Sequence, residues 1–144
     1  MSYGVTAVRP GMVAFVLSSM EPQGAHAAPH DTCVVVDTKS SKLVQLRDDL
    51  DATGLSKLSS LATATLRAQS EERDLRKLGF ASESITVSDS DALCVADDHG
   101  GLALEIRFHP DDLAGFAVGT KAELAASKVR GIFKPDSFAS RIFR

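Results

Sequence analysis

The spacing of apolar residues changes along this 144-residue chain, and the change restricts the folds that it can adopt. Between Asp51 and Leu78, apolar residues recur at close to 3.6-residue intervals, which predicts a helix. Leu75 and Leu78 fall on nearly the opposite face from the earlier apolar residues, so we expect this helix to bend, to break near Ser70 or to be covered on both sides. On either side of this segment, apolar residues form short runs or alternate with polar ones, which predicts strands. Because short polar turns join the strands and the helical segment alone interrupts them, we expect an α+β fold: a mostly antiparallel sheet built from hairpins, with helices packed on one face.

The clearest predicted strand is Leu102–Phe108. Its apolar residues occupy every second position, with Ala103, Glu105 and Arg107 between them, so we expect one buried face and one solvated face. The other predicted strands are Tyr3–Val8, Met12–Leu17, Cys33–Val36, Leu43–Leu46, Ile85–Val87 and Leu93–Ala96.

The segments between these strands carry turn and cap signals. Glu21–Asp31 contains two prolines and a glycine and has no apolar period, so it predicts a surface loop. A helix is expected to open at His109-Pro110, which acidic residues follow. A further helix is expected from Thr120 to about Arg130, with Glu123 completing a capping box.

Length and composition indicate one globular domain over residues 1–144. Hydrophobic residues make up 44% and charged residues 24%, which excludes wholesale disorder. The longest apolar run, Met12–Leu17, is too short to span a membrane. Together with Arg9 and Ala25-His26-Ala27 it loosely resembles a signal segment, but Pro10 and Glu21 interrupt that pattern and favour a buried strand. We therefore expect a soluble, cytoplasmic protein.

The two cysteines lie in apolar strand runs. Cys33 precedes three valines, and Cys94 lies between Leu93 and Val95. We expect both thiols to be buried, reduced and structural, since burial in apolar surroundings makes a thiol unreactive. A single bridge between them is the alternative.

One constellation suggests metal or thiol chemistry. His26, His30 and Cys33 are residue types that bind zinc, and His99 or His109 would have to complete the site. Their spacing matches no zinc-binding motif, so we expect no metal and no other cofactor.

The C-terminal tail, at about residues 131–144, is basic and aromatic. Residues 128–144 carry five basic and one acidic side chain, a net charge of +4, whereas the rest of the chain carries −7. Phe138 and Ile142 are four residues apart, so a short helix would place them on one side, with Pro135 in its first turn. The predicted partner-binding residues of the tail are Ile132, Phe133, Phe138, Arg141, Ile142, Phe143 and Arg144.

Several roles for the tail are open. It packs on its own domain, docks on a second copy or another protein, or binds nucleic acid or an anionic membrane. The last two are less favoured, because the whole chain has a net charge of −3.

These patterns predict a non-enzymatic binding or assembly module that self-associates or binds a protein partner. The positive signal is the tail, and the negative one is the lack of a coherent catalytic set. One alternative is a small metal- or thiol-dependent enzyme built around the loop from His26 to Cys33. Another is a regulatory domain that binds a small ligand between sheet and helix.

Overall fold

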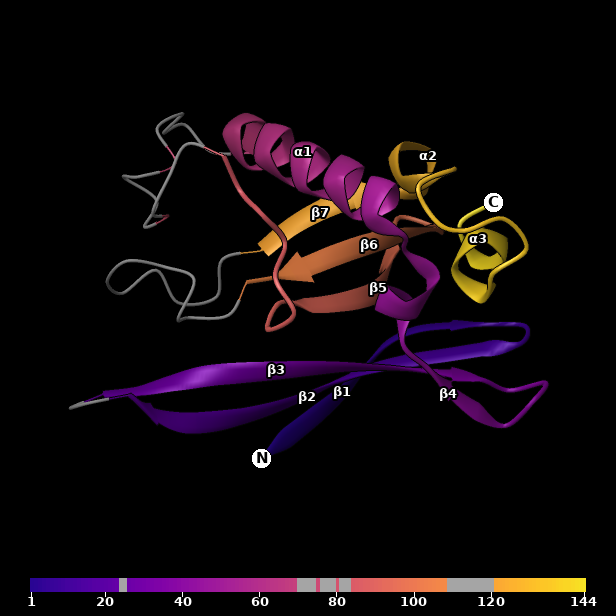
Figure 1. The fold of residues 1–144 in the computed structure, drawn as a ribbon. Coiled ribbons are helices and arrows are strands. Elements are labelled where there is room, and N and C mark those ends of the chain that lie inside the picture. The colour runs from indigo at the N-terminus through magenta and orange to yellow at the C-terminus, as the bar shows by residue number, and fades with distance from the viewer. Residues whose placement is uncertain (24–25, 70–74, 76–79, 81–83, 109–120) are drawn as a thin grey trace.

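The computed structural model describes residues 1–23, 26–69, 75, 80, 84–108 and 121–144 (Figure 1). It confirms the α+β class: the described residues form two antiparallel sheets and a few helices. The elements are β1 (Ser2–Arg9), β2 (Met12–Gln23), β3 (His26–Asp37), β4 (Lys42–Val44), the 3₁₀ helix η1 (Leu46–Asp49), α1 (Ala52–Gln69), β5 (Ala92–Asp98), β6 (Gly101–Arg107), β7 (Lys121–Ala125), α2 (Ala126–Val129) and α3 (Phe138–Ile142).

The first sheet has the strand order β1-β2-β3-β4 and is built from hairpins. Gly11 forms the turn after β1 in the left-handed conformation, with φ of 87°. The predicted loop Glu21–Asp31 was wrong for most of its length. There β2 and β3 remain paired out to Gln23 and His26. The backbone pairing continues without an apolar period, because main-chain hydrogen bonds do not depend on the side chains.

The second sheet has the order β5-β6-β7. A two-residue turn joins β5 to β6, and both of its residues, His99 and Gly100, have positive φ, as a type I′ hairpin requires. The helix predicted from Thr120 was wrong over Lys121–Ala125, which is strand β7. There Ala122 and Leu124 are fully buried, so the segment has a two-residue period. The helix expected after His109 lies outside the described residues.

Helix α1 begins at Ala52, two residues after Leu50 at the end of η1, and covers one face of the second sheet (Figure 1). Asp51 caps its start, since Asp51 Oδ1 accepts a hydrogen bond of 2.7 Å from the Gly54 amide. The structure describes α1 as far as Gln69, beside Ser70, near which a break was one of the expected possibilities. Most of the segment from there to Leu78 lies outside the described residues.

Ile85 and Val87 are buried and Thr86 is exposed, but the segment is not a strand, contrary to the prediction. Its amides find partners on α1 instead of on a neighbouring strand. The Ile85 amide donates to Thr63 Oγ1 and the Val87 amide to Ser59 Oγ, each over 3.0 Å. Hydroxyls on the helix thus replace the hydrogen bonds that a strand partner would make.

The core lies between α1 and the second sheet and extends to the first sheet. The predicted buried face of β6 is confirmed for Leu104, Ile106 and Phe108, which are 0–6% exposed, and Leu102 is partly buried. The expected solvated face is wrong for two of its three residues. Ala103 is fully buried, and Glu105 is only 4% exposed because the disulfide and ion pairs described below cover this side of β6.

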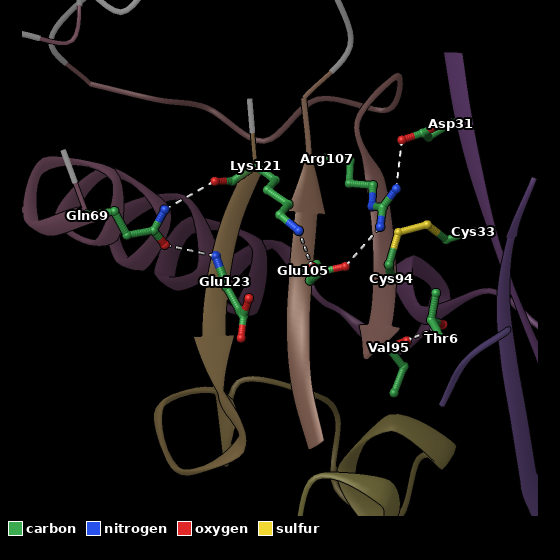
Figure 2. Close-up of polar contacts among 10 residues, drawn as sticks. All are labelled: Thr6, Asp31, Cys33, Gln69, Cys94, Val95, Glu105, Arg107, Lys121 and Glu123. Atoms are coloured by element: carbon green, nitrogen blue, oxygen red, sulfur yellow. Dashed lines mark hydrogen bonds and ion pairs between the residues drawn. A yellow bond between two sulfur atoms is a disulfide. The ribbon is translucent and has the colours of Figure 1, made fainter. Parts of the chain in front are cut away.

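Strand β5 is the edge of the second sheet that lies against the first sheet (Figure 1). A bulge in β1 adds Thr6 between Val5 and Ala7, and Thr6 Oγ1 donates a 2.5 Å hydrogen bond to the Val95 carbonyl (Figure 2). This satisfies an edge carbonyl that would otherwise be left without a strand partner. No helix in the described part of the chain has the length and hydropathy needed to cross a membrane.

Candidate functional site

The side of the first sheet that faces away from the second sheet is apolar, and no described element covers it. Side chains alternate between the two faces of a strand, and the buried residues Ala7, Met12, Ala14 and Val35 mark the inner face. In the described part of the chain, no helix or strand lies over the opposite side (Figure 1). We call that side the outer face. It consists of Tyr3, Val5, Val8, Val13, Phe15, Leu17, Thr32, Val34, Val36 and Leu43.

The strand register arranges the outer face in three cross-strand rows. Tyr3 and Leu17 lie opposite each other and are followed by Thr32 on β3. The other two rows are Val5, Phe15 and Val34, and Val8, Val13, Val36 and Leu43. Neighbouring side chains in such rows lie about 5 Å apart, so they form one continuous patch.

The patch is apolar and free of charge. Tyr3, Val5, Val8 and Leu43 are 57–80% exposed, and Thr32 contributes the patch's one aliphatic hydroxyl. Its polar boundary begins with the next pair, Ser19 and His30. Monomeric proteins rarely expose a contiguous apolar patch of more than a few hundred Å², and a patch with a polar rim marks a docking surface.

A covalent bond holds the inner face of this sheet against β5. Cys33 and Cys94 form a disulfide with a Cα–Cα distance of 5.1 Å (Figure 2). The expectation of two reduced thiols was therefore wrong. Both cysteines lie where the two sheets meet. This position explains why the runs around them are apolar and why their sulfurs are close enough to bond.

An ion-pair network lies beside the disulfide (Figure 2). Glu105 on β6 accepts hydrogen bonds from Arg107 over 3.2 Å and from Lys121 Nζ over 3.0 Å. Arg107 also donates to Asp31 Oδ2 on β3 over 2.9 Å, so one guanidinium joins the two sheets. A buried carboxylate is tolerated where it is paired in this way.

Burial favours the neutral form of Asp31, but the hydrogen bonds from Ser18 and Arg107 and the charge of Arg107 outweigh it and lower the pKa of this carboxyl. Burial lowers the pKa of the Arg107 guanidinium, whereas its contacts with Asp31 and Glu105 raise it. The two carboxylates outweigh burial, so the pKa of Arg107 is raised. The link between the sheets is therefore fully charged at neutral pH.

We expect the free energy of unfolding to fall as the pH drops below about 4, in part through Asp31. Its folded pKa lies below the ordinary value of 3.8, so the unfolded chain binds the proton first and acid favours unfolding. This contribution is present above the unfolded pKa and is lost as the pH falls through the folded pKa. Urea unfolding between pH 2.5 and pH 6 would measure it.

In that experiment the Asp31→Asn variant should have a lower free energy of unfolding than the wild type at pH 6. Below about pH 4 its free energy of unfolding should fall less than that of the wild type. The matched control is Asp48→Asn, which removes a carboxylate from an exposed position. Equal slopes for Asp31→Asn and the wild type would show that the ion pair between the sheets does not contribute.

The predicted metal candidates do not converge. Cys33 has no free thiolate, because it is bonded to Cys94. His30 lies beside the Arg107 end of the β5–β6 hairpin, whereas the exposed His99 forms the turn at its other end. His26 is placed only as a backbone position at the end of β3, and His109 lies outside the described residues. Within the described ranges, no three His, Cys, Asp or Glu side chains are grouped to hold a metal ion.

The tail residues divide into two groups. Ile132, Phe133 and Phe143 are 1–8% exposed and belong to the core of their own domain. The rings of Phe133 and Phe143 stack with centroids 5.6 Å apart. Phe138 and Ile142 are partly buried and, with Arg141 and Arg144, line a surface cleft. Partner binding through that second group stays a prediction.

The predicted tail helix exists as α3, but it begins later than expected. It runs from Phe138 to Ile142, and Ser137 caps it by accepting a 3.1 Å hydrogen bond from the Ser140 amide. Pro135 and Asp136 precede the cap. Asp136 has a φ of 61°, which a helical residue does not adopt.

The outer face was not among the predicted sites. Met12–Leu17 and Cys33–Val36 are continuous apolar runs, and such runs are typical of strands that are covered on both sides. The sequence did contain a signal for such a face. It predicts one long helix, and one helix is too small to cover every apolar strand. No protein-family model matches the sequence, and no curated protein gives a significant match.

Proposed function

We propose that the protein is a non-enzymatic assembly module that forms a homodimer by packing the outer faces of two copies against each other. The observation that carries the proposal is the uncharged, exposed, three-row patch on an otherwise packed sheet. It supports the self-association expected from the sequence and assigns it to the sheet instead of the tail.

The size of the face supports a stable interface. The rows of the outer face extend over residues 3–8, 12–17, 32–37 and 42–44, and at a rise of about 3.4 Å per residue and a strand spacing of about 4.8 Å they cover roughly 350 Å² in projection. The accessible surface of a face with protruding side chains is larger than its projection. With a polar rim around this apolar centre, as interfaces usually have, the area approaches the roughly 800 Å² per partner of a standard interface.

The absence of charge favours a second copy as the partner. In a twofold-symmetric interface the same patch meets itself, so a charge near the axis would face its own copy, and a charge elsewhere would be buried against apolar residues. The outer face contains none. Two such sheets can pack about 10 Å apart with their strands within about 30° of each other, as the sheets of a β-sandwich do.

Val5→Lys tests this proposal. Val5 lies in the middle row beside Phe15, so a lysine there would place a charge without a partner inside the apolar patch of the dimer interface. We expect the wild type to be a dimer in light scattering and the Val5→Lys variant to be a folded monomer. The circular dichroism of the two should be the same.

The matched control is Ser127→Lys, which adds the same charge at an exposed position on α2. It should remain a dimer. A wild type that is monomeric across the accessible concentration range would overturn the proposal, and so would equal dissociation of both variants. A wild type that stays monomeric but binds neutral lipid vesicles through Val5 would assign the face to a membrane.

The disulfide also bears on the compartment in which the protein works. The cytoplasmic location was predicted from the lack of a membrane-spanning run and of a clear signal segment, whereas the Cys33–Cys94 disulfide favours a different compartment. Structural disulfides persist in oxidising compartments. We therefore propose that this module works in an oxidising compartment.

A further inference from the structure

A basic cleft lies on a different part of the molecule from the outer face. It has a volume of about 610 Å³ and is bounded by the β1–β2 turn, the start of β6 and the helices α2 and α3. Its charged lining consists of Arg9, Asp37, Lys39, Arg130, Arg141 and Arg144. Five cations thus face one carboxylate, although the whole chain is acidic.

Part of the cleft lining is apolar. Leu102 at the start of β6 contributes to it with Phe138 and Ile142 from α3, and all three are only partly buried. The cleft therefore combines an apolar surface that includes one aromatic ring with cationic side chains. Its volume lies within the 300–1,000 Å³ that is usual for small-molecule sites.

Two of the five cations have partners within the protein. Arg9 pairs with Asp97 over 2.5 Å and donates to the Gly101 carbonyl, which ties β1 to the β5–β6 hairpin. Arg141 donates to the Asp136 carbonyl over 2.6 Å. These contacts fix part of the cleft wall.

The other three cations, Lys39, Arg130 and Arg144, have no hydrogen bond or ion pair from their side chains to any described residue. The carboxylate of Asp37 accepts hydrogen bonds from the Lys39 and Ser40 amides, so it is already engaged in its own turn. The cleft thus keeps several unused donors and a net positive charge.

We infer that this cleft binds a phosphorylated small molecule that carries a flat organic group, such as a nucleoside diphosphate. Arginine side chains offer paired donors that match phosphate oxygens, and Lys39 adds a point charge. Phe138 offers a surface on which a base can lie. Neither Phe138 nor the three unpaired cations belong to the outer face, so this inference does not depend on dimer formation.

Calorimetric titration with ADP and with inorganic pyrophosphate tests the inference on the full chain. We expect one ADP per chain, and we expect pyrophosphate to bind more weakly because it has no base to contact the apolar part of the lining. Arg130→Gln should weaken both ligands by about tenfold or more, the usual effect of losing a hydrogen bond to a charged group. Phe138→Ala should weaken ADP and leave pyrophosphate unchanged.

Lys128→Gln is the matched control, because Lys128 is exposed on α2 and does not line the cleft. It removes the same charge and should leave both affinities within about twofold. Lys39→Gln gives a second test from a different element, should Arg130→Gln fail to fold.

Three results would overturn the inference. The first is that ADP does not bind. The second is that Arg130→Gln and Lys128→Gln weaken ADP binding equally, which would show that only the overall positive potential of this surface attracts ADP. The third is that a single-stranded oligonucleotide binds at this surface while ADP does not, which would make it a polymer interface.

Discussion

Removing the Cys33–Cys94 disulfide is expected to lower the free energy of unfolding by about 4 kcal/mol. The two cysteines are 61 residues apart in sequence, and a loop of that length loses about this much closure entropy when it is cross-linked in the unfolded chain. The bond also joins β3 to β5, so it holds together two sheets that share no backbone ladder. Urea unfolding of the wild type and of a Cys33→Ala, Cys94→Ala variant would measure the difference.

The reduced wild type is the control for packing. It keeps both sulfurs, including that of the 1%-exposed Cys94, and loses only the cross-link. We therefore expect it to lose most of the 4 kcal/mol, with a smaller further loss in the double variant. Two titratable thiols in the denatured, unreduced protein would show that the bond is absent and would restore the prediction of free cysteines.

The cysteines illustrate what the sequence leaves undetermined. Each lies in a run whose local pattern predicts a buried strand, and both runs are strands. Whether two thiols 61 residues apart meet depends on how the sheets pack, and no local pattern records that. By contrast, the buried face of β6 was predicted correctly, because alternation between its residues is a local signal.

The segment after Thr120 shows long-range pairing overriding a local signal. Thr120 and Glu123 form a capping-box pattern, which favours a helix. The chain instead pairs Ala122 with Ile106 and Leu124 with Leu104, because this buries both apolar residues against the sheet. Strand formation depends on such neighbours more than on intrinsic preference.

For the two candidate sites as well, local patterns indicate some of the residues but not the arrangement that completes each site. Arg141 and Arg144 were expected to bind a partner because the tail is basic, but the cleft also needs Arg9 and Lys39 from two distant turns. The outer face was missed because a strand's pattern shows that it is apolar and does not show what covers it. Cover comes from other elements, and for this face the described residues provide none (Figure 1).

The tail provides a direct test of how the core and the candidate sites are divided. Phe143→Ala is expected to lower the free energy of unfolding by about 3–5 kcal/mol, because Phe143 is 1% exposed and stacks on Phe133. The surrounding backbone is held by Asp49, which accepts hydrogen bonds from the Lys134 amide through its carbonyl and from the Ala139 amide through its carboxylate. This anchoring limits how far the site can collapse around the missing ring.

Phe138→Ala is the matched control in the same helix. Phe138 is only partly buried and lines the cleft, so its loss should cost less than half as much. Urea unfolding would measure both variants, and equal losses would show that α3 is not anchored through Phe143. Light scattering of the folded Phe143→Ala variant adds a second outcome. Because the outer face lies on β1–β4, this variant should still dimerise, whereas a folded monomer would show that the tail forms the interface.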